Sequence, residues 1–127
     1  MQGEIGLGAA IGWFTAHGYW VSIPLCDNQP YDLIVDDGTG PQRVQVKTTT
    51  RRGPYGNFLV MLETAGGNQS FHTRKPFDNT KSDLLFVLAD DGAMYVIPSA
   101  KIACRRTLTL CSKYAQYQVV GGGFEPP

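Results

Sequence analysis

Residues 30–50 read PYDLIVDDGTGPQRVQVKTTT, and this stretch decides the fold. Residues 31–36 and 42–49 are strand-like runs rich in β-branched side chains, and the DGTG sequence between them has the composition of a turn. The pattern predicts a β-hairpin. The same hairpin carries the polar residues from which a function can be inferred.

The register of this hairpin predicts a polar cluster. If the turn is centred between Gly38 and Thr39, Asp32 lies opposite Gln45, and directly opposed residues are roughly 4.5–5.5 Å apart on one face. Lys47 shares the face of Gln45 because strand side chains alternate. A slip of one residue would separate these groups, so the prediction depends on the register.

A helix is predicted before the hairpin, over residues 3–17. Its apolar stripe at helical spacing is Leu7, Ile11 and Phe14. Glu4 falls on the same stripe, so we expect its carboxylate to point toward the sheet. Glycines cost about 1 kcal/mol each in a helix interior, which predicts that this helix packs closely on a neighbouring backbone. Those glycines are Gly6, Gly8 and Gly12.

The remaining pattern favours one α/β domain over residues 1–120 and a flexible tail over 121–127. Residues 84–88 are continuously apolar, which is typical of a central strand in a sheet. The other predicted elements are strands at 19–23, 57–63 and 114–120, a hairpin of 83–89 with 93–98, a long surface loop at 65–80, and a helical turn at 99–103.

Composition narrows the class of protein. The formal net charge is zero, so bulk charge gives no indication of nucleic-acid binding, but residues 1–42 contain no Lys or Arg and all basic residues follow. The three cysteines have no zinc-type or disulfide-type spacing. No stretch has the length of a membrane span or the features of a signal peptide. We therefore expect a cytoplasmic protein that makes no contact with a membrane.

The chemistry of the predicted cluster suits a divalent cation. Mg²⁺ prefers oxygen ligands, and the carboxylates of Asp32 and Glu4 and the amide oxygen of Gln45 are such donors. Lys47 could orient a water molecule for attack on a phosphate while the metal activates that water. Mn²⁺ could substitute for Mg²⁺. The predicted catalytic residues are thus Glu4, Asp32, Gln45 and Lys47.

These residues resemble a known family. The order of Glu4 on a first helix, PYD at residues 30–32 and QVK at residues 45–47 resembles the PD-(D/E)XK nuclease superfamily. The longer runs GEIGLGAAIGWFTAHGYWVSIPL, PYDLIVDDG, RVQVKTTT and FDNTKSDLLFVLADDGAMYVIP resemble the group I intron-encoded homing endonucleases and their bacterial and phage relatives.

The resemblance implies a restriction-endonuclease-like fold, with a central mixed sheet flanked by helices, and Mg²⁺-dependent hydrolysis of phosphodiesters in double-stranded DNA. It also implies a homo-oligomer, a dimer or a tetramer. By position, Asp32 matches the metal-binding aspartate, Lys47 the motif lysine and Glu4 the first-helix glutamate. Gln45 replaces the usual second acid, and a neutral amide binds Mg²⁺ more weakly.

Candidate DNA contacts follow the motif lysine and recur in the long loop. Hydroxyl and guanidinium groups directly after Lys47 could bind phosphates beside the cut. The predicted DNA-binding residues are Thr48, Thr49, Arg51, Arg52, Arg74 and Lys75. Two alternatives stay open: a structure-specific nuclease of the junction-resolvase type, and a DNA-binding module without catalysis, in which Gln45 marks a decayed site.

Overall fold

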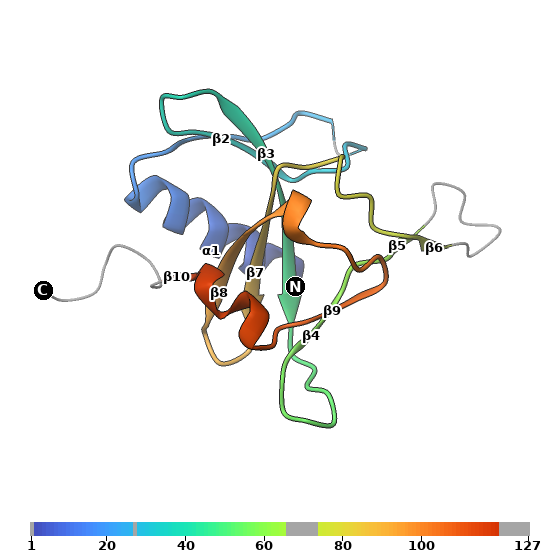
Figure 1. Cartoon of the computed structure of the whole chain (residues 1–127). Coiled ribbons are helices and arrows are strands. Elements are labelled where there is room, and N and C mark those ends of the chain that lie inside the picture. Colours follow the sequence, from blue (N-terminus) through green and yellow to red (C-terminus); the bar gives the residue numbers. More distant parts are fainter. Residues whose placement is uncertain (1, 27, 66–73, 120–127) are drawn as a thin grey trace, which may run out of the picture.

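The computed structural model describes residues 2–26, 28–65 and 74–119 (Figure 1). Within them, a six-stranded sheet forms the centre of the fold, in the order β1-β2-β3-β7-β8-β10. The strands are β1 (Trp20–Ser22), β2 (Leu33–Asp36), β3 (Pro41–Thr49), β7 (Leu84–Ala89), β8 (Met94–Pro98) and β10 (Gln118–Val119). Strands β3 and β7 pair in parallel and the other neighbours are antiparallel, which confirms the predicted mixed sheet.

The β2–β3 hairpin has the predicted register. Leu33 pairs with Val44 and Asp36 pairs with Pro41, so the turn is centred between Gly38 and Thr39. Gly38 has a φ of 101°, a conformation that glycine adopts without steric cost, and its N–H donates to Asp36 Oδ1 at 2.8 Å. Local turn chemistry thus fixes which β3 residues face β2.

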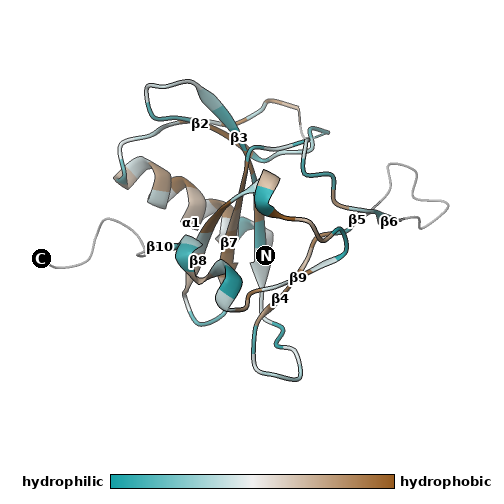
Figure 2. Ribbon diagram, viewed as in Figure 1, coloured by the Kyte–Doolittle hydropathy of each residue, from teal (hydrophilic) through white to brown (hydrophobic). Residues whose placement is uncertain are grey.

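Each face of the sheet is covered by a different layer. Helix α1 (Gln2–Ala16) lies on one face, where Phe14 packs in a cluster with Val44 and Phe86. On the other face, Leu85 and Val87 pack in a cluster with residues of β4 (Leu59–Met61) and β9 (Thr107–Thr109), which form a small sheet of their own. Because both faces of β7 are covered, its sequence is apolar throughout, as Figure 2 shows.

The buried face of α1 is rotated by about one residue, roughly 100°, from the predicted stripe. Its buried residues are Gly6, Ala10, Trp13 and Phe14, while Leu7 and Ile11 are half-buried. At Gly6 a Cβ would lie 2.5 Å from Thr48 Cγ2, so the absence of a side chain lets α1 approach β3 this closely on the rotated face. Nothing lies within 4 Å of a Cβ built on the other two interior glycines, Gly8 and Gly12, so close packing is wrong for them.

Several peripheral elements differ from expectation. The predicted loop 65–80 includes part of a two-stranded ribbon, β5 (Thr64–Ala65) with β6 (Arg74–Lys75), residues 76–80 follow without strand, and residues 66–73 lie outside the described residues. The predicted strand 114–120 is mostly the 3₁₀ helix η3 (Ser112–Tyr117), followed by β10. The helical turn at 99–103 is confirmed as η2 (Ser99–Lys101), whereas the proposed tail 121–127 is outside the described residues.

The described part of the chain contains no helix that is both long and apolar enough to cross a membrane.

Candidate active site

The carboxylate of Asp32 is held against the backbone of β3. Asp32 stands one residue before β2, and its N–H donates to the Val44 carbonyl at 2.8 Å. Its Oδ2 accepts a hydrogen bond from the Val46 N–H at 2.8 Å. Regular pairing therefore ends at Leu33 and Val44, and the expected direct pairing of Asp32 with Gln45 is wrong. The carboxylate instead lies beside the peptide that precedes Lys47.

Lys47 and Gln45 lie on the sheet face opposite to α1. Lys47 is in register with Val87, and Gln45 is in register with Leu85. The side chains of Leu85 and Val87 belong to the core cluster on the face away from the helix. Val46, between them in sequence, packs on the helix side. The predicted sharing of one face by Gln45 and Lys47 is thus consistent with the observed strand alternation.

The ammonium group of Lys47 is half-buried beside an acid. Desolvation by burial lowers the pKa of Lys47, and the charge of Asp32 opposes that shift in part. A cation that has lost part of its hydration interacts more strongly with nearby anions, because the local dielectric constant is low. The charges of Asp32 and Lys47 therefore influence each other where β2 begins beside β3, although no ion pair joins the two side chains among the described residues.

Gln45 opens onto a cavity of about 360 Å³. Five segments of the chain line this cavity, and the lining residues are Pro30, Gln45, Leu62, Lys75, Pro76, Phe77, Asp78, Lys81 and Arg105. Pro30 stands two residues before Asp32, and Gln45 two residues before Lys47. The cavity is thus the concave surface that adjoins the predicted site, as expected for a ligand-binding pocket.

Glu4 differs from the other predicted site residues. The first turn of α1 crosses β3 at Val46 and Thr48, as the contacts of Gly6 show. The Glu4 side chain is exposed and does not point toward the sheet, because the buried face of the helix is the rotated one. Among the described residues, Glu4 forms no hydrogen bond or ion pair with Asp32, Gln45 or Lys47.

The predicted DNA-binding residues separate into distinct groups. Thr49 is buried and its hydroxyl bonds to the Leu59 carbonyl, so Thr49 does not fit a phosphate contact. Thr48 faces α1. Lys75 is exposed and lines the cavity with Gln45, and the side chain of Arg74 is outside the described atoms.

Arg51 and Arg52 lie beyond the far end of β3 and are both exposed. Arg52 stacks on the ring of Phe58, with its guanidinium carbon 3.9 Å from the ring centroid, and donates to the Gly56 carbonyl at 2.6 Å. Arg52 also pairs with Asp91 of the β7–β8 turn at 3.9 Å, so its side chain is engaged by protein groups, whereas Arg51 is exposed after the end of the strand.

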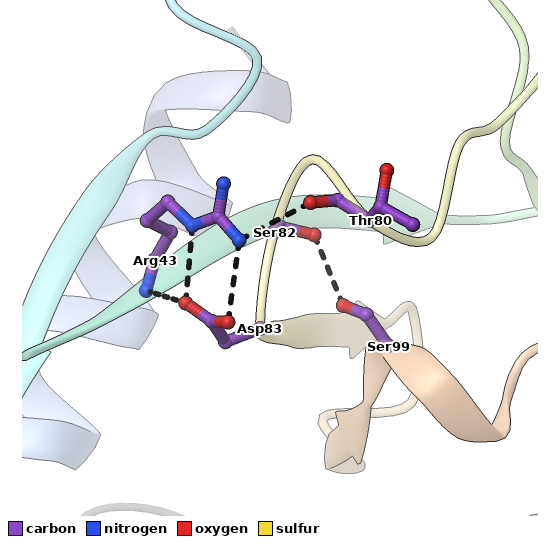
Figure 3. Close-up of polar contacts among 5 residues, drawn as sticks. All are labelled: Arg43, Thr80, Ser82, Asp83 and Ser99. Atoms are coloured by element: carbon purple, nitrogen blue, oxygen red, sulfur yellow. Dashed lines mark hydrogen bonds and ion pairs between the residues drawn. The ribbon is translucent and has the colours of Figure 1, made fainter.

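A second polar cluster fixes the parallel pairing of β3 with β7 (Figure 3). The backbone N–H and the Nε–H of Arg43 both donate to Asp83 Oδ2, at 2.7 and 3.1 Å, and Nη2 donates to Asp83 Oδ1 at 3.3 Å. The same Nη2 donates to the Thr80 carbonyl at 3.2 Å. The buried hydroxyls of Ser82 and Ser99 are 3.0 Å apart beside this cluster. Sequence reasoning did not single out this group.

Lys81 and Arg105 were also missed as lining residues of the cavity. Arg105 precedes β9, and its carbonyl accepts the N–H of Phe77 at 2.7 Å, so distant segments meet here. No local periodicity signals such a meeting. Within the described ranges no three His, Cys, Asp or Glu side chains group together as metal ligands, and the predicted donor set contains two carboxylates and one amide.

Comparisons with known proteins agree on one family. The sequence model described as PD-(D/E)XK endonuclease matches residues 1–117. The solved structure of the bacterial homing endonuclease I-Ssp6803I is similar to the chain, with a TM-score of 0.74 and 26% sequence identity over 87% of this chain and 76% of that chain. No curated protein matches.

Proposed function

The chain belongs to the PD-(D/E)XK endonuclease family, and from this premise we propose that it hydrolyses phosphodiester bonds of double-stranded DNA with a divalent metal ion. The observation that carries the proposal is the position of the Asp32 carboxylate, which accepts the N–H of Val46, the residue before the partly buried Lys47. A carboxylate anchored by a backbone N–H and a partly desolvated ammonium provide a metal ligand and a cation in one small volume.

The residues fit a hard cation. The hydrogen bonds among the described residues engage only Oδ2 of Asp32, which leaves its other oxygen for a ligand. The Gln45 amide opens onto the adjoining cavity, and Glu4 is exposed on the first turn of α1, which crosses β3 at Val46. We propose Asp32, Gln45 and Glu4 as the residues that hold Mg²⁺ or Mn²⁺, with Glu4, which makes no contact with the other two, joining only through the ion. When bound, the ion would activate water and stabilise negative charge on the phosphate.

Lys47 would act on the attacking water and on the phosphate. Its lowered pKa keeps the proton less tightly held than on an exposed lysine, so the amine can orient a water molecule and exchange a proton with it. The ammonium form also places positive charge where the transition state gains negative charge. Both roles require the half-buried position that the β3 strand gives it.

The proposed substrate and assembly follow from the similarity to a homing endonuclease. We propose that Arg51, Arg74 and Lys75 contact backbone phosphates and that two or four copies assemble on a duplex, since one small domain covers only a short site. The three cysteines are free, which supports action in a reducing cytoplasm.

The test is cleavage of supercoiled plasmid and genomic DNA by the purified chain. We expect cutting with Mg²⁺ or Mn²⁺, none with EDTA, and cutting weaker by about 10²-fold for Lys47→Ala. Lys101→Ala is the matched control, because Lys101 is exposed on η2 and away from the site residues. Equal cutting by Lys47→Ala and the unmodified chain would contradict the proposed site, and metal-independent cutting would contradict the proposed chemistry.

A further inference from the structure

The cavity beside Gln45 has a concentrated positive charge. Lys75 and Lys81 line it from the segment 75–81 and Arg105 lines it from the segment before β9, in a chain whose net charge is zero. A group of cations from distant segments around one concave surface raises the local concentration of anions. The opposing charge in the cavity is Asp78.

Asp78 does not cancel this charge by pairing closely with the cations. Its Oδ1 accepts hydrogen bonds from the Thr80 N–H at 2.9 Å and from the Thr80 hydroxyl at 2.6 Å. Those bonds are the main cause of its lowered pKa, and the charges of Lys81 and Arg105 contribute least. The Asp78 carboxylate therefore stabilises the turn at residues 78–80, and the three cations leave the cavity with an excess of positive charge.

Apolar residues line the cavity together with the cations. Phe77 and Leu62 are buried core residues, and Pro30 and Pro76 complete the wall. The Phe77 N–H donates to the Arg105 carbonyl at 2.7 Å, so the segment with Lys75 and the segment with Arg105 are fixed to each other. A cavity lined by both apolar side chains and cations matches the chemistry of a sugar and its phosphate.

We propose that this cavity binds a backbone phosphate of the DNA next to the phosphate that is cut, with Lys81 and Arg105 as the phosphate-binding residues and Lys75 beside them. The inference rests on the proposed nuclease function and deepens it. Because Gln45 belongs both to the cavity and to the predicted metal ligands, a strand held here runs directly into the site of Asp32 and Lys47.

Binding to phosphates can be measured without knowledge of the target sequence, because it is largely independent of base sequence. The experiment measures the affinity for a fluorescent duplex by anisotropy in EDTA over a series of KCl concentrations. The test variant is Lys81→Gln with Arg105→Gln. The matched control is Lys101→Gln with Arg106→Gln, which has the same net charge as the test variant. Lys101 is exposed on η2, and the Arg106 guanidinium pairs with Glu63 at 3.1 Å outside the cavity.

We expect the test variant to bind about tenfold more weakly at low salt, with a log–log salt slope smaller by about 0.9, the value for one lost phosphate contact on duplex DNA. The control should keep the slope of the unmodified chain. Lys81→Gln alone, at an exposed position, should show the same direction of change and serves if the double variant does not fold.

The inference is overturned if the test variant and the control change the slope equally, or if the unmodified chain does not bind duplex DNA at low salt. Cleavage by the unmodified chain is measured in parallel with Mg²⁺. If cleavage is absent while the slopes differ as expected, the nuclease proposal fails and the phosphate pocket stands.

Discussion

Two aspartates flank β3, and each stands one residue before a neighbouring strand. Asp32 precedes β2 and accepts the Val46 N–H at 2.8 Å, while Asp83 precedes β7 and accepts the Arg43 N–H at 2.7 Å. The two carboxylates therefore make the same backbone contact on opposite edges of one strand. They differ in what satisfies the rest of the carboxylate.

Asp83 is fully engaged by protein groups. Arg43 donates from its backbone and from two side-chain nitrogens, and these bonds lower the pKa of Asp83. Asp32 has one backbone donor among the described residues and faces Lys47 without a hydrogen bond between them. Two aspartates in the same position before a strand therefore differ in role. The Asp83 carboxylate is structural because Arg43 donates hydrogen bonds to both of its oxygens, whereas the Asp32 carboxylate keeps one oxygen available for a ligand.

The largest effect should come from Asp32→Asn. We expect cleavage to fall on the order of 10³-fold, since the variant loses the charge that would hold the metal opposite the phosphate. The amide oxygen can still accept the Val46 N–H, so the thermal unfolding temperature should change little. Asp83→Asn is the paired variant and should retain cleavage. The comparison breaks if Asp83→Asn loses as much activity as Asp32→Asn when both are folded.

Lys47→Met should lower cleavage by about 10²-fold, because it removes the cation near the reacting phosphate. The same change should raise the unfolding temperature at neutral pH. Folding lowers the pKa of Lys47 below that of the unfolded chain, so the unfolded chain binds more protons between the two pKa values. Stability of the unmodified chain should therefore rise with pH through that window.

That pH-dependent rise should be missing in Lys47→Met. Thermal unfolding of both proteins at several pH values up to the ordinary pKa of lysine checks the difference, and Lys101→Met is the matched control. An unfolding temperature that falls in Lys47→Met at neutral pH would show that the ammonium stabilises the fold instead of being held there at a cost.

Glu4→Gln should lower cleavage by about tenfold, a smaller effect, and added Mg²⁺ should restore part of the lost activity. The carboxylate is exposed and makes no contact with Asp32, so it would join the site only through a metal ion. Cleavage is measured over a range of Mg²⁺ concentrations, with Asp90→Asn, an exposed acid in the β7–β8 turn, as the control. Identical Mg²⁺ dependence in Glu4→Gln and the unmodified chain would remove Glu4 from the proposed site.

The β2–β3 hairpin could be predicted from sequence because its determinants are local. The turn glycines and the alternation in β3 fix the register, and the register places Gln45 and Lys47 on one face. The prediction failed at Asp32, which lies just outside the strand. Its carboxylate, instead of a backbone carbonyl of β2, accepts the hydrogen bond from the Val46 N–H. A pattern of alternating residues gives no sign of where pairing stops.

The rest of the site depends on contacts between distant segments. Arg105 lines the cavity with Phe77 and Gln45, which are distant in sequence, and β9 pairs with β4, more than 40 residues earlier in the chain. The face of α1 was misjudged because hydrophobicity favoured Leu7, whereas close packing on β3 selected the smallest residue, Gly6. A hydrophobic stripe predicts which helix residues are buried. Where a helix packs closely on a strand, however, the residue at the point of contact must be small, and this requirement sets which face of the helix is buried.

The smallest effect, and the sharpest check on the comparison, is the loss of stability in Asp83→Asn. We expect about 1 kcal/mol, the typical net value of a hydrogen bond, discounted because the Asp83 and Arg43 side chains are each 39% exposed. Folding lowers the pKa of Asp83, so its charge contributes stability above the unfolded pKa and loses that contribution as the pH falls through the folded value. Urea unfolding of both proteins should therefore differ at neutral pH and converge in acid. If the difference persists unchanged in acid, the contribution of Asp83 is packing and not charge, and the contrast with Asp32 would rest on geometry alone.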